Sequence, residues 1–520
     1  MPSLYDYTSY ADAKTHFSDE ALWALFDGSR DNLNIAHECI DRHAEDPNRI
    51  AVRIAHADGR DELITFDAIS RWSSRFAHEL AARGVQRGER VAVMLEPSLA
   101  FYACIFGCMK FGAIAVPMFM LFGPEGARLR LDDCSPRVLV TTEKKASEIG
   151  QLCGIDVLIP RGEFFTRLET HPVYFEWQTS ANDMAAFQYT SGTTRALPEA
   201  IRHTHRAIVL VGIAALYGTG IRPGDEFFCP SSPAWGHGLW HGTLAPLAFG
   251  VTTGVYAGRF NADRLMKALQ DYSITNLSAA ATHYRMMMNA GTADRYRFAI
   301  EKLSFTGEPI DDECLKFVEQ TFQKPVCSMY GTTEIGVILV NYPGASDFPV
   351  KPGSLGKAVP NVEVEVQRPD GASTAAGEIG EIKLLRRSEW YPTKDLGYVD
   401  KDGYFYHAGR ADDVIISAGW TMSAIEIENA LLAHPDINEA AAIGVPDETR
   451  GQIVKAYLVT TRPGEGRFVR EVQEFVRNRL SQHEYPRQIE FVAEIPKTPA
   501  GKVNRKTLRD RERHIGAGSF

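Results

Sequence analysis

The fold of this chain is constrained most by an alternation of short apolar runs with segments of helical periodicity. Apolar residues recur at helical spacing over Phe66–Ala82, and a buried strand expected at Arg90–Leu95 is followed by a helix that ends near Phe111. The same order returns later in the chain, with strands expected at Glu226–Cys229 and Ile274–Ser278. Short strands connected through helices predict an α/β fold in which helices cover a parallel sheet.

Two changes in composition divide the rest of the 520 residues, which are too many for one compact core. Near residue 350, glycine and proline begin to punctuate short alternating strands such as Val362–Gln367, so we expect a β-rich subdomain at about 345–409. After Arg410–Asp413 strands and helices alternate again. We therefore predict an N-terminal domain at 1–409, a hinge at 410–413 and a small α+β C-terminal domain at 414–520.

Charge and hydropathy argue against several classes of partner. The net charge is −10, and the sequence has no basic tract of the kind that binds nucleic acid. The longest apolar run, at 111–122, is too short to span a bilayer and is interrupted by Pro117. The first residues show no export signal, and the eight cysteines form no CxxC pair, which indicates reduced thiols. We predict a cytoplasmic protein without nucleic-acid or membrane partners.

A hydroxyl-rich stretch lies between an apolar strand at Met184–Tyr189 and an apolar segment at His205–Leu216 that is suited to a buried helix. Thr190–Thr194 places four hydroxyl side chains around one glycine, and Pro198 closes the stretch. Hydroxyl donors, backbone N–H groups and a glycine that permits close approach are what a polyphosphate needs. An ordinary Ser/Thr-rich surface turn is the alternative. The P-loop pattern GxxxxGK[ST] does not occur here.

Three further segments carry weaker signals. Ser328–Glu334 follows a strand end expected at Val326 and offers a ring for a purine and a carboxylate for Mg²⁺; a helix N-cap is the alternative. Asp395 could accept hydrogen bonds from a ribose diol, although a surface turn acid is the simpler interpretation. Lys502 lies on a basic, glycine-bearing loop and can bring positive charge to an anionic transition state, with a solvated turn as the alternative.

In order and spacing these segments resemble the adenylate-forming superfamily, which contains acyl-CoA synthetases, firefly luciferase and the adenylation domains of peptide synthetases. The likeness covers nearly the whole chain and is greatest to the AMP-forming carboxylate:CoA ligases. It implies a large N-terminal domain of helix-covered sheets with a β-barrel subdomain, and a small mobile C-terminal domain. It also implies an enzyme that joins a carboxylic acid to AMP and then transfers the acyl group to coenzyme A, using ATP, CoA and Mg²⁺.

The resemblance implies a role for each matching residue. The residues expected to bind the β- and γ-phosphates of ATP are Thr190, Ser191, Gly192, Thr193 and Thr194. Those expected around the adenine, ribose and α-phosphate are Gly307, Glu308, Pro309, Tyr330, Gly331, Thr332, Thr333, Asp395 and Arg410. Those expected to line the pantetheine tunnel are Ser417, Ala418, Gly419 and Trp420. Glu334 would bind Mg²⁺ and Asp412 would be the hinge, while Lys502 would bridge the carboxylate and the α-phosphate. Lys502, Glu334 and Thr190 are the predicted catalytic residues.

Three departures from the pattern of that superfamily concern ATP affinity and the CoA loop. In the hydroxyl loop, Arg195 replaces a glycine, and Glu199 stands where a phosphate-facing cation is common. We hypothesise that Arg195 or Arg202 supplies the missing charge. Lys394 replaces the usual glycine before Asp395, and Thr421 replaces the usual arginine after the aromatic residue of the CoA loop.

The acid is expected to be compact: an aromatic, alicyclic or short- to medium-chain carboxylate. Trp235, His237, Gly238 and Tyr284 would border the acyl pocket, because bulky rings limit chain length. Alternatively the tryptophans belong to the core, the methionines at 286–288 provide adaptable packing, and His237 contacts a second polar group of the substrate. Transfer to a carrier-protein phosphopantetheine and a weakened nucleotide-binding scaffold are the alternative functions. A homodimer is left open.

Overall fold

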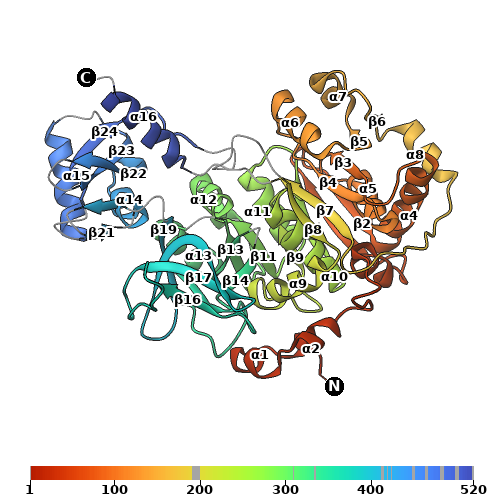
Figure 1. Cartoon of the computed structure of the whole chain (residues 1–520), viewed down its shortest axis with the longest axis horizontal. Coiled ribbons are helices and arrows are strands. Elements are labelled where there is room, and N and C mark those ends of the chain that lie inside the picture. The colour runs from red at the N-terminus through yellow and green to blue at the C-terminus, as the bar shows by residue number, and fades with distance from the viewer. Residues whose placement is uncertain are drawn as a thin grey trace. The chain divides into compact units, whose positions relative to one another are not determined.

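The structure is a computed structural model that describes residues 2–189, 200–307, 310–332, 335–410, 415–417, 420–422, 424–447, 451–462, 466–480, 485–497 and 503–517 (Figure 1). The chain divides into two compact units. Unit 1 comprises residues 1–307, 317–350 and 359–361, and unit 2 comprises residues 308–316, 351–358 and 362–520. Each unit has its own hydrophobic core.

Unit 1 contains two sheets that are mainly parallel and are covered by helices (Figure 1). The first has the order β6-β5-β3-β4-β7-β8, in which β7 and β8 are antiparallel and the other neighbours are parallel. Its strands are β3 (Arg90–Met94), β4 (Ile114–Pro117), β5 (Val138–Thr141), β6 (Asp156–Leu158), β7 (Met184–Tyr189) and β8 (Ala200–Thr204). Its helices are α4 (Phe66–Ala82), α5 (Leu99–Phe111), α6 (Pro124–Cys134), α7 (Glu143–Ile149) and α8 (Gly162–Glu169).

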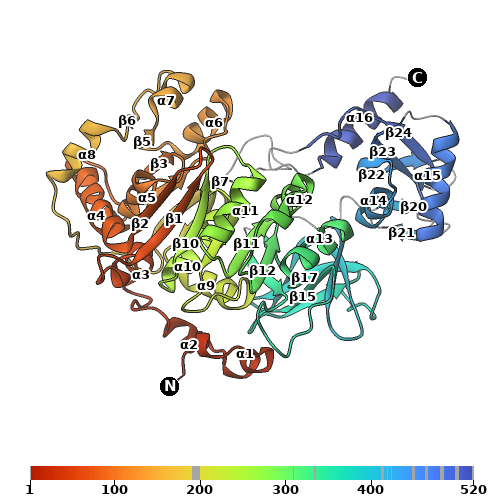
Figure 2. The ribbon, with the colours of Figure 1, turned by 180° about the vertical axis from the view of Figure 1, so that it is seen from behind.

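The second sheet of unit 1 has the order β14-β13-β12-β11-β9-β10-β1-β2, with parallel neighbours from β13 to β1 (Figure 1 and Figure 2). Its strands are β1 (Ile50–His56), β2 (Asp61–Thr65), β9 (Phe227–Cys229), β10 (Thr253–Ala257), β11 (Asn276–Ala280), β12 (Lys302–Thr306), β13 (Val326–Thr332) and β14 (Gly336–Val340). The accompanying α-helices are α9 (Ala207–Ile213), α10 (Ala245–Ala248), α11 (Ala262–Asp271) and α12 (Ala281–Ala290), and α13 (Asp312–Phe322) belongs to unit 2 up to residue 316 and to unit 1 beyond it. Two π-helices are η3 (Ala214–Gly218) and η4 (His237–Leu244). Short helices complete the unit: η1 (Leu4–Asp6), α1 (Tyr10–His16), α2 (Asp19–Trp23), α3 (Ile35–Cys39), η2 (Asp41–His43) and η5 (Ala293–Arg295).

Unit 2 begins with antiparallel strands in the order β16-β17-β18-β19-β15, where the β-rich subdomain was expected. These strands are β15 (Ser354–Ala358), β16 (Val364–Gln367), β17 (Gly380–Arg386), β18 (Glu389–Val399) and β19 (Phe405–Arg410). The remaining strands are β20 (Ile415–Ser417), β21 (Trp420–Met422), β22 (Ile437–Asp447), β23 (Gly451–Thr460) and β24 (Gln488–Phe491). The helices are α14 (Ala424–Leu432), α15 (Gly466–Arg479) and α16 (Arg505–Ala517).

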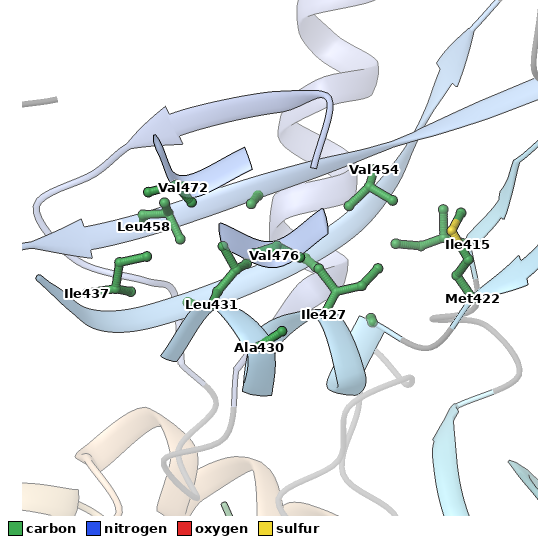
Figure 3. Packing of buried hydrophobic residues seen from close by; sticks show 14 of the residues in the cluster. Ile415, Met422, Ile427, Ala430, Leu431, Ile437, Val454, Leu458, Val472 and Val476 are labelled. Carbon is green, nitrogen blue, oxygen red and sulfur yellow. The ribbon is translucent and has the colours of Figure 1, made fainter. Parts of the chain in front are cut away.

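The core of the C-terminal part of unit 2 lies between α14, α15 and the sheet β22-β23-β24 (Figure 3). Ile427 and Leu431 of α14 and Val472 and Val476 of α15 are completely buried, together with Leu458 of β23. A spacing of four places each pair on one face of its helix. Because burial of one such side chain contributes about 1.5–3 kcal/mol, the amphipathic pattern is also what stabilises this part of the chain.

The order of strands and helices expected from the sequence is confirmed over most of the chain, with two corrections. The sequence reasoning missed β8, which pairs with β7 so that Tyr189 lies opposite Ala200. Residues 190–199 therefore connect two neighbouring strands and do not lead directly into a helix. The second correction is that β13 begins at Val326 and does not end there. The predicted domain boundary stays a prediction, since residues 411–414 lie outside the described part.

The helices and the cysteines were two further subjects of the sequence-based expectations. None of the helices among the described residues is both long enough and apolar enough to cross a membrane. None of the eight cysteines forms a disulfide, and all except Cys153 are buried. Burial raises the pKa of the Cys229 and Cys327 thiols to about 12, so these cysteines act as small apolar side chains rather than as nucleophiles.

Candidate active site

Four neighbouring parallel strands of unit 1, β13, β12, β11 and β9, end at one edge of the second sheet. Phe305 of β12 pairs with Ser328 of β13, and the same register continued by two residues places Gly307 beside Tyr330. Ligands of open parallel sheets bind outside the carboxyl ends of the strands. The structure thus brings two residues expected near the adenine to one edge, although they come from separate segments of the sequence.

Gly307 and Gly331 occupy positions that require glycine. Gly307 is exposed with a φ of +95°, and no atom lies within 4 Å of the place where a Cβ would be. At Gly331 a Cβ would collide with the carbonyl oxygen of Gly336 across the β13–β14 hairpin. Because β13 turns into another strand, the helix N-cap interpretation of this segment is wrong. The open backbone at Gly307 therefore permits another group to approach closely, and the missing side chain at Gly331 permits the close contact with Gly336.

The two residues expected to bind ribose are cross-strand partners in unit 2. Asp395 of β18 lies directly opposite Arg410 of β19. Asp395 is buried, with 6% of the residue exposed, and its carboxylate lies 3.7 Å from Nε2 of His407. The preceding residue, Lys394, has a φ of +63°, in the left-handed region that favours glycine. This explains physically why a glycine is usual at that position in the superfamily and indicates backbone strain in the present chain.

His237, at the start of η4, is held by serine hydroxyls on both ring nitrogens. Its Nδ1 lies 2.9 Å from the hydroxyl oxygen of Ser231, and its Nε2 lies 2.9 Å from that of Ser278 on β11. The neighbouring Gly238 has no room for a side chain, since a Cβ would collide with the carbonyl oxygens of Ser231 and Ser232. Close packing of η4 on the loop after β9 therefore fixes the His237 ring, and both of its nitrogens are already engaged.

The two other residues expected at the acyl pocket differ in exposure. Trp235 is partly exposed, and its ring lies 5.1 Å from that of Phe119. Tyr284 is completely buried, and its hydroxyl lies 2.9 Å from the carbonyl oxygen of Ser304. The placement of Tyr284 favours a role in the core beneath β11 and β12, whereas Trp235 is accessible.

Sequence reasoning missed a set of polar side chains around η4. Trp240 donates from Nε1 to the Gln188 Oε1 atom at 2.9 Å, and the His203 ring lies 4.6 Å from the Trp240 ring. Burial lowers the pKa of His203, His241 and His283 to about 4 each. Burial, with smaller effects from His241 and His283, also holds the pKa of His237 well below its usual value. The four imidazoles are therefore neutral at pH 7, and the repeated histidines in the sequence were a signal that could have found them.

Residues 40–387 match the AMP-binding enzyme family, and residues 426–502 match the AMP-binding enzyme C-terminal domain. The chain belongs to the AMP-binding enzyme family. The acetyl-coenzyme A synthetase of Bacillus subtilis is 29% identical to it, over 98% of this chain and 96% of the relative. The 4-hydroxybutyrate–CoA ligase 1 of Metallosphaera sedula is 29% identical, over 87% of this chain and 86% of the relative.

Solved structures agree with this AMP-binding enzyme in fold. The acyl-CoA synthetase of Brucella canis has a TM-score of 0.76 and 30% identity, covering 98% of this chain and all of the other (100%). The anthranilate CoA ligase AuaEII, solved with anthranoyl-AMP, has a TM-score of 0.83 and 25% identity, covering 93% of this chain and 98% of the other. The expected fold class is confirmed, and so is the expected enzyme class, an AMP-forming acid–thiol ligase that uses ATP and CoA.

Several predicted site residues of this AMP-binding enzyme lie outside the described part of the chain. They are Thr190, Ser191, Gly192, Thr193, Thr194, Arg195, Glu199, Glu308, Pro309, Thr333, Glu334, Asp412, Ala418, Gly419 and Lys502. Ser417 and Trp420 are described as strand residues of β20 and β21, where they pair with each other. The roles expected for all these residues stay predictions.

Proposed function

We propose that this enzyme activates a compact carboxylic acid as its acyl-adenylate and then transfers the acyl group to the thiol of CoA. The observation that supports the proposal is the shared edge of β13, β12, β11 and β9, where Tyr330 lies in β13 and Gly307 directly follows β12. His237 is held on β11 of the same sheet through Ser278. Three strand spacings separate β13 from β9, which is roughly 14 Å at about 4.8 Å per spacing. An adenylate can lie along this edge with its base over β12–β13 and its acyl group toward β9.

The proposed chemistry needs stabilisation of charge more than it needs a nucleophilic side chain. One carboxylate oxygen of the acid attacks the α-phosphorus of ATP, pyrophosphate leaves, and the thiol of CoA then displaces AMP from the acyl carbon. Negative charge develops at the α-phosphate, where Lys502 and a Mg²⁺ ion bound by Glu334 would stabilise it. Asp395 and Arg410 would hold the ribose hydroxyls. The buried thiols described above support a mechanism without a covalent cysteine intermediate.

The aromatic residues around η4 limit the size of the acid that can bind. The rings of Trp235 and Phe119 stand near the start of the helix, 5.1 Å apart. Bulky rings at these places leave room for a short or ring-shaped acyl group and not for a long chain. The acids named for relatives, acetate, 4-hydroxybutyrate and anthranilate, are of this size and support the proposal.

The test is a screen of aryl, alicyclic, branched and linear acids in which pyrophosphate release and acyl-CoA mass are both measured. The proposal expects acid-dependent pyrophosphate and a matching amount of acyl-CoA for compact acids. Acyl-AMP that accumulates in the presence of CoA would instead favour a carrier-protein acceptor. A preference for long-chain acids would contradict the compact pocket. A cytoplasmic location and a homodimer stay proposals, to be tested by fractionation and by light scattering.

A further inference from the structure

Four buried nitrogen atoms around η4 have no hydrogen-bond partner within the described chain. They are Nε2 of Gln188, Nε2 of His203, Nδ1 of His241 and Nδ1 of His283, which we call the imidazole–amide cluster. Gln188 is almost completely buried, at 1% exposure. Buried polar atoms in native proteins nearly always have a partner, so a group of unpartnered ones near a reaction site points to a ligand or to water.

Local structure holds the Gln188 side of the cluster in place. The Trp240 indole donates to Oε1 of Gln188, which fixes the amide and leaves its NH₂ group as the free donor. Gln188 lies opposite Ile201 in the β7–β8 pair, and His203 is two residues further along β8 on the same face. The Trp240 ring packs on His203. Gln188, His203 and Trp240 therefore meet on one side of the first sheet.

The π-helix brings His241 to the same side. In a π-helix residues four and five apart are neighbours, so Trp240 and His241 both lie next to Gly236, and His241 also lies next to His237. A Cβ on Gly236 would lie 3.6 Å from Oε1 of Gln188, and the His237 and His241 rings lie 6.2 Å apart. His283 is close enough to His237 to affect its charge. The cluster therefore surrounds the start of η4, next to the position proposed for the acyl group.

The chemistry of the cluster limits what it can bind. An amide NH₂ group donates, and a neutral imidazole Nδ1 donates or accepts, so the set complements a hydroxyl or carbonyl oxygen. Its members include no cation that would balance a second carboxylate. His237 itself is saturated by Ser231 and Ser278 and acts as a positioning residue.

We propose that the acid used by this enzyme carries, besides its carboxylate, an uncharged hydroxyl or carbonyl group that the imidazole–amide cluster binds. This inference rests on the proposed ligase function. A site built to bind a polar group discriminates strongly against an analogue that lacks the group, because its own polar atoms are then left without partners. A pocket lined only by hydrocarbon side chains would instead favour the analogue that lacks the polar group.

The test compares pairs of acids that differ by one hydroxyl group in place of one methyl group. We would measure kcat/KM by pyrophosphate release for 4-hydroxybutyrate against pentanoate, and for 3-hydroxybenzoate against 3-methylbenzoate. For at least one pair, we expect kcat/KM to be higher for the hydroxyl acid by about tenfold or more. The His241→Phe variant should reduce that ratio to about one, and His241→Asn, which keeps a hydrogen-bonding group, should restore part of it.

His78→Phe is the matched control, because His78 is a half-buried imidazole on α4 that bonds to the Tyr174 carbonyl oxygen outside the cluster. It should leave the ratio unchanged, and thermal melting would confirm that every variant is folded. Equal use of both members of each pair, an unchanged ratio in His241→Phe, or a preference for succinate over both linear acids would overturn the inference while leaving the ligase in place. If no acid yields acyl-CoA, the proposed function itself fails.

Discussion

Unit 1 and unit 2 differ in the kind of side chain that each offers for the reaction. At the sheet edge of unit 1 the described candidates are glycines, aromatic rings, hydroxyls and neutral imidazoles. The candidates in unit 2 are charged: Asp395 lies opposite Arg410 in the described part, and Lys502 belongs to this unit in the sequence. We propose that the described residues of unit 1 bear on which base and acyl group fit, and that Lys502 of unit 2 adds positive charge at the α-phosphate. The hydroxyl loop at 190–194 and Glu334, which belong to unit 1, would share the stabilisation of phosphate charge.

The largest effect is expected at Lys502, because we propose that its charge acts in the adenylation half-reaction. Lys502→Ala should reduce acid-dependent pyrophosphate release by about a thousandfold, while conversion of supplied acyl-AMP to acyl-CoA continues. Lys497→Ala is the control, since Lys497 forms an ion pair with Glu439 at 2.8 Å. Equal loss of both half-reactions would remove the charge-stabilising role from unit 2.

A substitution at Gly307 tests the shape-based role of unit 1. Gly307→Ala places a Cβ on the open backbone at a φ of +95°, so we expect the KM for ATP to rise about tenfold, with a loss of about 1–2 kcal/mol in stability. Gly377→Ala carries the same strain, with a φ of +83° and nothing within 4 Å of the added Cβ. If Gly307→Ala and Gly377→Ala raise the KM for ATP equally, backbone strain alone would explain the increase, and Gly307 would have no specific role in ATP binding.

The neutral imidazoles of unit 1 predict a loss of stability at acid pH. In the unfolded chain His203, His241 and His283 bind protons near pH 6.5, whereas burial keeps their pKa near 4 in the folded enzyme. Between these values the unfolded state binds more protons, so stability falls as the pH is lowered from 6.5 to 4. The slope is up to about 1.4 kcal/mol per pH unit for each group.

Melting temperatures at pH 7.5, 6.0 and 5.0 check this prediction. The His241→Phe variant should show a shallower decline than the wild type, because one protonating group is removed. A melting temperature that is constant across these pH values would mean that the histidines are charged or exposed in the folded state.

The smallest effect is expected at Lys394 in unit 2, where the backbone is strained. Lys394→Gly relieves the left-handed conformation but adds freedom to the unfolded chain, so a net stabilisation of at most about 1 kcal/mol is expected. Lys394→Ala keeps the strain and should not stabilise the protein. If both variants melt alike, the gain would come from removal of the side chain and not from relief of the backbone.

Much of the fold was predictable because it depends on local periodicity. The helices at Phe66–Ala82 and Ala262–Asp271 were expected at those positions, since their apolar stripes are long and regular. β8 was missed because Arg202, His203 and Thr204 carry no alternating pattern, and its pairing with β7 depends on a partner beyond the hydroxyl loop. The strand at Val326 was placed on the wrong side of that residue because an apolar run alone does not say which end of a strand it marks.

The order of motifs along the sequence determined by itself the superfamily and the α/β class, since each motif depends on a few adjacent residues. The tertiary structure decided which residues meet: the ends of β12 and β13 before Gly307 and at Tyr330, Asp395 opposite Arg410, and His237 bonded to Ser231 of the loop after β9 and to Ser278 of β11. It also moved Tyr284 into the core and revealed the unpartnered nitrogens around η4. Register, burial and hydrogen-bond satisfaction depend on neighbours that are distant in sequence, and for that reason no local pattern could have predicted them.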